Sequence, residues 1–108
     1  MPEPQQGEVW WADLDRPIGK RPVLVLTRTS AVPQLTNVTV APVTRSIRGI
    51  PSEVRLDPAD GVPTVSAVSL ENILTVPKRT LRRWIASLSA EKMRLVFAAI
   101  RFVFAIPE

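Results

Sequence analysis

Apolar and polar residues alternate over short stretches in the first two thirds of the chain, and this period of two is typical of half-buried β-strands. Prolines and other turn residues separate the stretches, so we expect short strands joined by tight turns. The predicted strands are residues 8–14, 22–27, 37–43, 52–57, 66–70 and 83–86, with a turn at 58–63 and one helical turn at 77–81. Strands of this length and spacing predict a small barrel or a curled sheet.

Residues 89–106 follow a helical period instead, with Ser89 as the N-cap and Pro107 as the stop. The apolar run is too short to cross a bilayer, so no membrane is expected. One apolar stripe, predicted to face the sheet, consists of Met93, Val96, Phe97, Ile100, Val103 and Phe104. A second stripe consists of Leu95, Ala99, Phe102 and Ile106. It either widens the buried face or, as we favour, contacts another protein.

The composition limits the chemistry that this chain can perform. We treat residues 1–108 as a single domain, with a polar, proline-rich and flexible N-terminus at residues 1–6. The chain has no histidine, cysteine or tyrosine. A Ser-His-Asp triad, a Cys-His pair, a two-histidine ribonuclease and a structural zinc site are therefore excluded. We expect no cofactor and no metal, so that Asp, Glu, Lys, Arg, Ser or Thr must carry any catalysis.

The charge balance favours no single partner by itself. The chain has 14 basic and 10 acidic residues, and 11 of the basic residues are arginines. Arginine binds phosphate through two parallel hydrogen bonds, but an arginine excess is explained equally well by genome composition. The absence of cysteine, together with an N-terminus that lacks a signal pattern, agrees with a cytoplasmic protein.

Three segments combine groups that suit a phosphate. Pro22 restricts the backbone of Arg21 at the entrance of a strand, which prepares Arg21 to meet an anion, unless it is simply a solvated side chain beside a turn. Residues 41–49 add hydroxyls and guanidiniums in one loop, which is either a phosphate site or a polar loop in which Thr44 bonds its own backbone. In residues 69–72, Glu71 is a general base, an orienting partner of Arg21 or a surface ion-pair member.

Trp10 and Trp11 are adjacent, so they face opposite sides of the predicted strand. One of them belongs to the core. The other is exposed or at an interface, where a nucleobase could stack on it.

These segments, in this order, resemble the MazF/PemK/Kid family of toxins from bacterial toxin–antitoxin pairs. The resemblance extends from Gly7 to about Ile106 and rests on an ordered set of short motifs. They are Gly7-Glu8-Val9-Trp10, Asp13-Leu14-Asp15, Lys20-Arg21-Pro22-Val23-Leu24-Val25, Val40-Ala41-Pro42-Val43-Thr44, Ile47-Arg48-Gly49, Glu53-Val54 and Ser69-Leu70-Glu71-Asn72-Ile73, followed by Leu88-Ser89 and the last helix.

The resemblance implies a mainly β fold with a C-terminal helix, a small SH3-like barrel of the MazF/CcdB type, which is usually a homodimer. It implies metal-independent, sequence-specific cleavage of single-stranded RNA, mostly messenger RNA, which arrests translation. The nucleophile is the 2′-OH of the RNA, which agrees with the missing histidine and cysteine. The implied protein partner is an antitoxin whose flexible, acidic tail covers the RNA groove.

Position by position, Arg21 and Thr44 match the catalytic arginine and threonine of the family. Glu71 falls where some members have a functional carboxylate, and it either acts as the base or orients Arg21. We assign RNA binding to Lys20, Arg45, Ser46, Arg48 and Asn72.

The sequence also departs from the family pattern. The link at residues 15–20 is shorter than the usual loop over the site, Asn72 replaces a common glutamine, and Leu74 replaces a common arginine. Thr27-Arg28-Thr29 stands where many members have Ser-Asn-Asp. These changes bear on RNA sequence preference and on access to the site. Two other functions stay open: a barrel that binds a protein target, as CcdB-type gyrase poisons do, and an RNA-binding barrel without catalysis.

Overall fold

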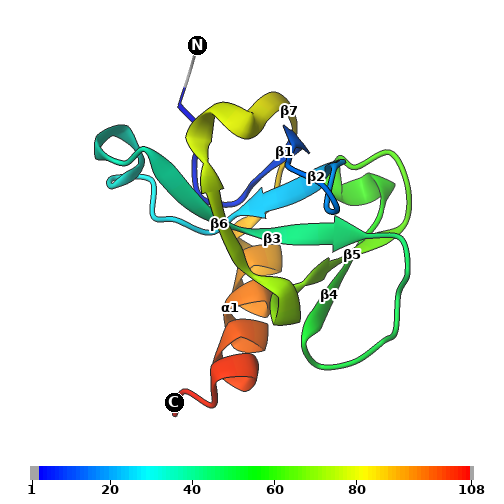
Figure 1. Ribbon diagram of the computed structural model, residues 1–108. Helices are drawn as coiled ribbons and strands as arrows, with labels where there is room; N and C mark the ends of the chain where they lie inside the picture. Colours follow the sequence, from blue (N-terminus) through cyan, green and yellow to red (C-terminus); the bar gives the residue numbers. More distant parts are fainter. Residues whose placement is uncertain (1–2, 108) are drawn as a thin grey trace.

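The computed structural model describes residues 3–107, and these residues fold into one curled antiparallel sheet with a helix packed against it (Figure 1). The elements are β1 (Glu8–Asp13), β2 (Lys20–Val25), η1 (Val32–Gln34), β3 (Asn37–Thr44), β4 (Glu53–Leu56), η2 (Pro58–Asp60), β5 (Ser66–Ser69), η3 (Leu70–Asn72), β6 (Leu74–Pro77), η4 (Lys78–Thr80), β7 (Leu81–Ser87) and α1 (Ala90–Phe104). The predicted mainly β fold with a C-terminal helix is confirmed.

Strand β3 is the centre of the sheet because it pairs on both edges. The strand order is β4-β5-β3-β2-β1-β7, and β6 pairs with the first half of β3 while β5 pairs with its end. Within residues 3–107, β4 and β7 form no ladder with each other, so the sheet curls without closing into a complete barrel. Strand β6 was not predicted from the sequence, and β2 begins two residues earlier than predicted.

Two hydrophobic clusters lie on opposite faces of the sheet, as the alternating side chains require. Leu24 belongs to the cluster that packs against α1, through Met93, Val96 and Ala99. Val23 and Val25 belong to the second cluster, on the other face, together with Trp10. Trp10 is therefore the core tryptophan of the adjacent pair.

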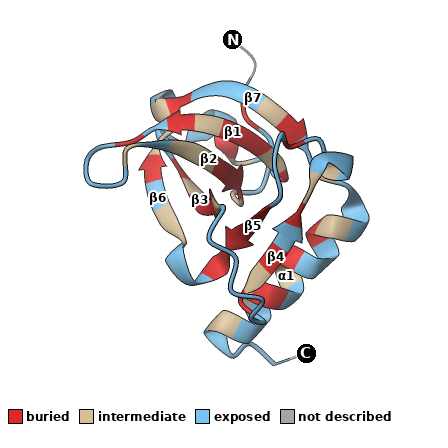
Figure 2. Ribbon diagram, turned by 90° about the vertical axis from the view of Figure 1, so that its right-hand side faces the viewer, coloured by how far each residue is buried: buried red, intermediate tan, exposed pale blue. Residues whose placement is uncertain are grey.

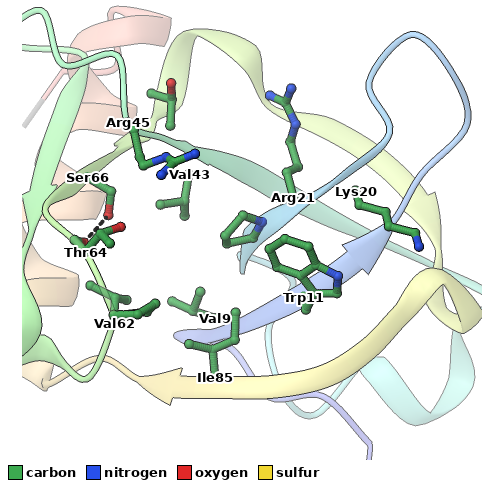
Figure 3. Close-up of a pocket in the computed structure, with 13 residues that line it drawn as sticks. Val9, Trp11, Lys20, Arg21, Val43, Arg45, Val62, Thr64, Ser66 and Ile85 are labelled. Carbon is green, nitrogen blue, oxygen red and sulfur yellow. Dashed lines mark hydrogen bonds between the residues drawn. The ribbon is translucent and has the colours of Figure 1, made fainter.

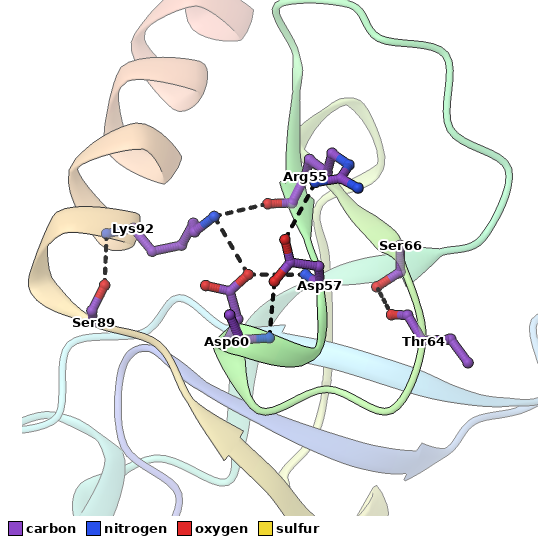
Figure 4. Close-up of polar contacts among 8 residues, drawn as sticks. Arg55, Asp57, Asp60, Thr64, Ser66, Ser89 and Lys92 are labelled. Carbon is purple, nitrogen blue, oxygen red and sulfur yellow. Dashed lines mark hydrogen bonds and ion pairs between the residues drawn. The ribbon is translucent and has the colours of Figure 1, made fainter.

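The N-terminus of α1 is tied to the turn that follows β4 (Figure 4). Ser89 is the N-cap, as predicted, and its Oγ accepts a hydrogen bond from Lys92 N at 3.0 Å. The Lys92 ammonium lies 3.4 Å from a carboxylate oxygen of Asp60 and donates to the backbone carbonyl of Arg55. These contacts fix the direction in which α1 leaves the sheet.

Replacing Ser89 by alanine should lower the free energy of unfolding by about 1 kcal/mol, because one backbone N–H of the first helical turn loses its acceptor. Urea unfolding followed by circular dichroism would measure the loss. Ser30→Ala, at an exposed position outside the helices and strands, is the control and should have no comparable effect. Equal stability of the Ser89→Ala protein and the wild type would show that the cap contributes nothing.

The outer side of α1 leaves large apolar side chains exposed, and exposed positions extend along much of the helix in Figure 2. Ala99 of the second stripe is buried, whereas Leu95, Phe102 and Ile106 are exposed. Phe104 was predicted to face the sheet, and that prediction is wrong, because its side chain is 58% exposed. The last turn of α1 extends past the sheet, so no strand lies opposite Phe104.

Residues 3–6, part of the N-terminus predicted to be flexible, contact other parts of the fold. Gln6 donates its backbone N–H to Thr29 Oγ1 and its side-chain amide to the carbonyl of Leu26, and Glu3 pairs with Lys78. Residues 1–2 lie outside the described residues. No helix among residues 3–107 has the length and apolar character needed to cross a membrane.

Candidate active site

The register of β2 and β3 brings Arg21 and Thr44 together. Val23 pairs with Pro42 and Leu24 with Ala41, and the same antiparallel register continued by two residues sets Arg21 opposite Thr44. Residues that lie opposite each other in such a pair project from the same face of the sheet. Two side chains that are 23 positions apart in sequence therefore lie side by side at the end of two strands with buried interiors.

Arg21 is half-buried, and its guanidinium is not committed to a structural contact. Its Nε is enclosed and has no hydrogen-bond acceptor among the described residues. The ion pairs within residues 3–107 are Arg55–Asp57, Lys78–Glu3 and Lys92–Asp60, and they include no pair of Arg21 with Glu71, which was one of the alternatives considered for Glu71. A buried donor without a partner is costly, and such positions are frequent at functional sites.

Arg21 and Thr44 lie between two cavities and line both of them. The first cavity, of about 440 Å³, is mainly apolar and contains Trp11 (Figure 3). The second, of about 530 Å³, is lined mostly by polar groups from the loop after β3, the start of β4, the end of β5 and η3. A phosphate bound by Arg21 and Thr44 would have one cavity on each side.

The loop between β3 and β4 is held in place by Glu53, the first residue of β4. One carboxylate oxygen of Glu53 accepts the backbone N–H of Arg48 at 2.9 Å and that of Gly49 at 3.1 Å. Gly49 has a φ of 68°, in the left-handed region that glycine adopts without strain. Glu53 thus positions the loop that carries Arg45, Ser46 and Arg48 at the edge of the site.

Removing that carboxylate should loosen the loop. In Glu53→Ala the two amides lose their acceptor, and we expect the KM for RNA to rise on the order of tenfold with a smaller change in kcat. Glu53→Gln keeps an acceptor oxygen, so its KM for RNA should stay close to that of the wild type. If Glu53 acted only through its charge, Glu53→Gln would raise the KM as Glu53→Ala does. Steady-state kinetics on a fluorogenic RNA would separate KM from kcat, and an unchanged KM in Glu53→Ala would contradict this positioning role.

The polar groups of the second cavity retain free hydrogen-bonding capacity. Thr44 Oγ1 accepts the backbone N–H of Ser46 at 3.0 Å, which leaves its hydroxyl proton available to a ligand. Asn72 donates one amide N–H to Ser69 Oγ at 2.8 Å and keeps its carbonyl oxygen free. Glu71 is exposed on η3 and makes no side-chain hydrogen bond among the described residues.

The structure brings all the predicted site residues around the two cavities. Lys20 and Arg45 line the Trp11 cavity, and Ser46, Arg48, Glu71 and Asn72 line the polar one. Three site residues were missed: Glu53, Ser69 and Ile18, which reaches the polar cavity from the short link at residues 15–20. For Ser69 the position two residues before Glu71 was the available signal, and for Ile18 the signal was its place in the link at residues 15–20, which corresponds to the family's loop over the site.

Comparison with known proteins shows the family of this chain. The family model described as PemK-like, MazF-like toxin of type II toxin-antitoxin system matches residues 5–104. The chain belongs to this family of toxins. It is 43% identical over 93 residues to the endoribonuclease MazF3 of Mycobacterium tuberculosis, covering 86% of this chain and 87% of that protein.

Two solved structures of MazF-like toxins are also similar. The toxin MazF-mt6 of Mycobacterium tuberculosis is 39% identical, with a TM-score of 0.86 over 94% of this chain and 99% of that chain. An endoribonuclease from a Mycobacterial species, solved in complex with its cognate antitoxin, is 25% identical, with a TM-score of 0.86 over 97% of this chain and 98% of that chain. Fold and sequence therefore identify the same family.

Proposed function

We propose that this MazF-like toxin is an endoribonuclease that cleaves single-stranded RNA and thereby inhibits translation. The observation that carries the proposal is that Arg21 and Thr44 both lie between two cavities, while among residues 3–107 Arg21 Nε has no acceptor and the Thr44 hydroxyl donates no hydrogen bond. Such a pair can bind the oxygens of a phosphodiester. The endoribonuclease relatives supply the reaction class.

The reaction we propose uses the substrate's own nucleophile. The 2′-oxygen attacks the adjacent phosphorus and loses its proton, the bond from phosphorus to the 5′-oxygen breaks, and the leaving oxygen takes up a proton. The first products are a 2′,3′-cyclic phosphate and a 5′-hydroxyl. No histidine or cysteine is needed for these steps, which suits a chain that contains neither.

Each catalytic group has a defined role in this proposal. Arg21 stabilises the charge on the phosphorane and donates a proton to the leaving oxygen, and Thr44 donates a hydrogen bond to a non-bridging oxygen. Glu71 removes the 2′-OH proton, a role that its lack of a protein partner leaves open to it. Lys20, Arg45, Ser46, Arg48 and Asn72 bind the RNA on either side of the cleaved bond.

The proposed partners follow from the surface. The apolar side chains exposed on α1 and directly after it, which are Leu95, Phe102, Phe104 and Ile106, suit a homodimer contact or an antitoxin contact. We further propose a cognate antitoxin with an acidic, flexible tail, which would compete with RNA for the cations of the site. Because the proposed substrate of the toxin is RNA that is being translated, a cytoplasmic location is part of this proposal.

A mixed RNA pool incubated with the purified protein, followed by mapping of the cut ends, would test the proposal. We expect cuts at a short recurrent sequence, and we expect them to persist in EDTA, because in the proposed mechanism Arg21, Thr44 and Glu71 provide the charge stabilisation and the proton transfers. Cleavage that stops in EDTA and returns with added metal would contradict the mechanism. RNA binding without cleavage would favour the non-catalytic barrel, and gyrase inhibition without either would favour the CcdB-type function.

A further inference from the structure

The cavity beside Trp11 is lined mainly by apolar side chains that have no role in the proposed cleavage chemistry. Its walls come from five separate parts of the fold and are apolar: Val9, Trp11, Pro22, Val43, Val62 and Ile85. Lys20, Arg21 and Arg45 lie around it, and no carboxylate lines it. Figure 3 shows the indole of Trp11 between Arg21 and Ile85. An apolar floor with a cationic rim suits a flat, uncharged ring that is attached to a phosphate.

Trp11 is held in a fixed place by its position in the sheet. Its strand β1 has a neighbour on each side, and Trp11 pairs with Pro22 of β2 and with Arg83 of β7. Directly paired residues share a face, and Pro22 lines the cavity together with Trp11. The half-buried ring therefore offers a preorganised aromatic surface, with the exposed Arg83 adding a further cation beside it.

The cavity is continuous with the proposed cleavage site, because Arg21 and Thr44 line both cavities. An RNA strand whose cleaved phosphate lies at Arg21 and Thr44 carries a nucleotide on each side of that phosphate. One of these nucleotides then reaches the polar cavity, and the other reaches the apolar cavity. A volume of about 440 Å³ lies within the range of small-ligand sites.

We propose that the Trp11 cavity binds the nucleobase of a nucleotide next to the cleaved phosphate, stacked on the indole of Trp11. Trp11 is then a specificity-determining residue of the RNA cleavage proposed above, on which this inference rests. Every nucleobase can stack on an aromatic ring, but the walls of the cavity limit the size of the base that fits. The cavity therefore selects among bases by shape rather than by hydrogen bonds.

An abasic scan of the RNA would test this inference without relying on the stability of a variant. A substrate containing the mapped cleavage sequence is prepared with a single abasic ribose at each position in turn. In the wild-type protein we expect kcat/KM to fall about 5- to 150-fold at one position adjacent to the cut, which corresponds to the loss of one stacked base.

The same scan in two variants decides whether Trp11 is responsible. Trp11→Leu keeps an apolar side chain but removes the aromatic ring. For this variant, the kcat/KM of the intact substrate should fall to that of the substrate that is abasic at that position. Trp11→Phe keeps a ring and should retain a discrimination close to that of the wild type. Trp84→Leu is the matched control, since Trp84 is 52% exposed on β7 and pairs with Trp10 on the opposite face.

The possible outcomes are distinguishable. If the wild type does not cleave any RNA, the proposed function itself fails. If the wild type cleaves and Trp11→Leu keeps the wild-type abasic profile, the stacking role is overturned while the nuclease function stands. The stacking role is also overturned if no position next to the cut responds to base removal, in which case the cavity serves another partner, such as a segment of an antitoxin.

Discussion

Arg21→Lys should cleave RNA about 100-fold more slowly than the wild type, and Arg21→Ala about 1000-fold more slowly. Lysine keeps the positive charge but cannot offer two parallel N–H groups to a phosphorane, so the difference between charge and geometry is measured directly. Single-turnover cleavage of an RNA that contains the mapped site would give both rates. Arg21→Lys activity close to that of the wild type would rule out the bidentate role.

The fold should tolerate these changes. The Arg21 side chain forms no ion pair within residues 3–107, and its Nε has no acceptor there, so its loss breaks no structural contact of that kind. We expect an unfolding free energy within about 1 kcal/mol of the wild type. Arg55→Lys is the matched control, because Arg55 is an exposed arginine on β4 that pairs with Asp57 at 3.3 Å away from the site. It should leave cleavage unchanged.

An RNA that lacks the 2′-OH only at the cleaved position should bind but should not be cut. The reaction proposed here has no nucleophile other than the 2′-oxygen, so cleavage at that bond should fall below detection. Binding should persist, since the cations around the site contact phosphates, which the deoxy substitution leaves in place. Gel analysis of the products and fluorescence anisotropy of the intact strand would provide the two readouts.

The control substrate carries the same single 2′-deoxy substitution two nucleotides away from the cut, and it should be cleaved like ordinary RNA. Continued cleavage at the deoxy position would mean that water is the nucleophile. Glu71 would then have to activate a water molecule, and the assignment of the cyclic phosphate as first product would be wrong.

Local patterns in the sequence predicted that Arg21 and Thr44 lie at strand ends, whereas their catalytic role was implied by the family resemblance and stays a proposal. Pro22 restricts Arg21 at the start of an apolar run, and Thr44 ends an alternating run, so each lies at the end of a strand. The antiparallel order of the two strands then brings them together. The helix cap at Ser89 and the core position of one of the adjacent tryptophans also follow from local patterns.

Other features depend on long-range geometry, which a local pattern does not contain. Strand β6 is four residues long and ends in a proline, so only its pairing with β3 defines it. Glu53 is an ordinary strand residue until its carboxylate meets two amides of the preceding loop. Phe104 keeps the helical period but is 58% exposed, because the last turn of α1 extends past the sheet (Figure 1), and the period cannot show where the sheet ends.

The strands and the connecting segments around the site differ in how well they tolerate substitutions and changes of length. Arg21 and Thr44 lie on the strands β2 and β3, whereas most of the polar cavity comes from the loop held by Glu53, the turn η3 and the short link that carries Ile18. Substitutions and length changes in these connections can alter which RNA sequence fits while the reacting groups keep their spacing. Gene duplicates of such a toxin can therefore diverge in target without losing activity, and exchanging these connections is a direct route to redesigning the cleavage sequence.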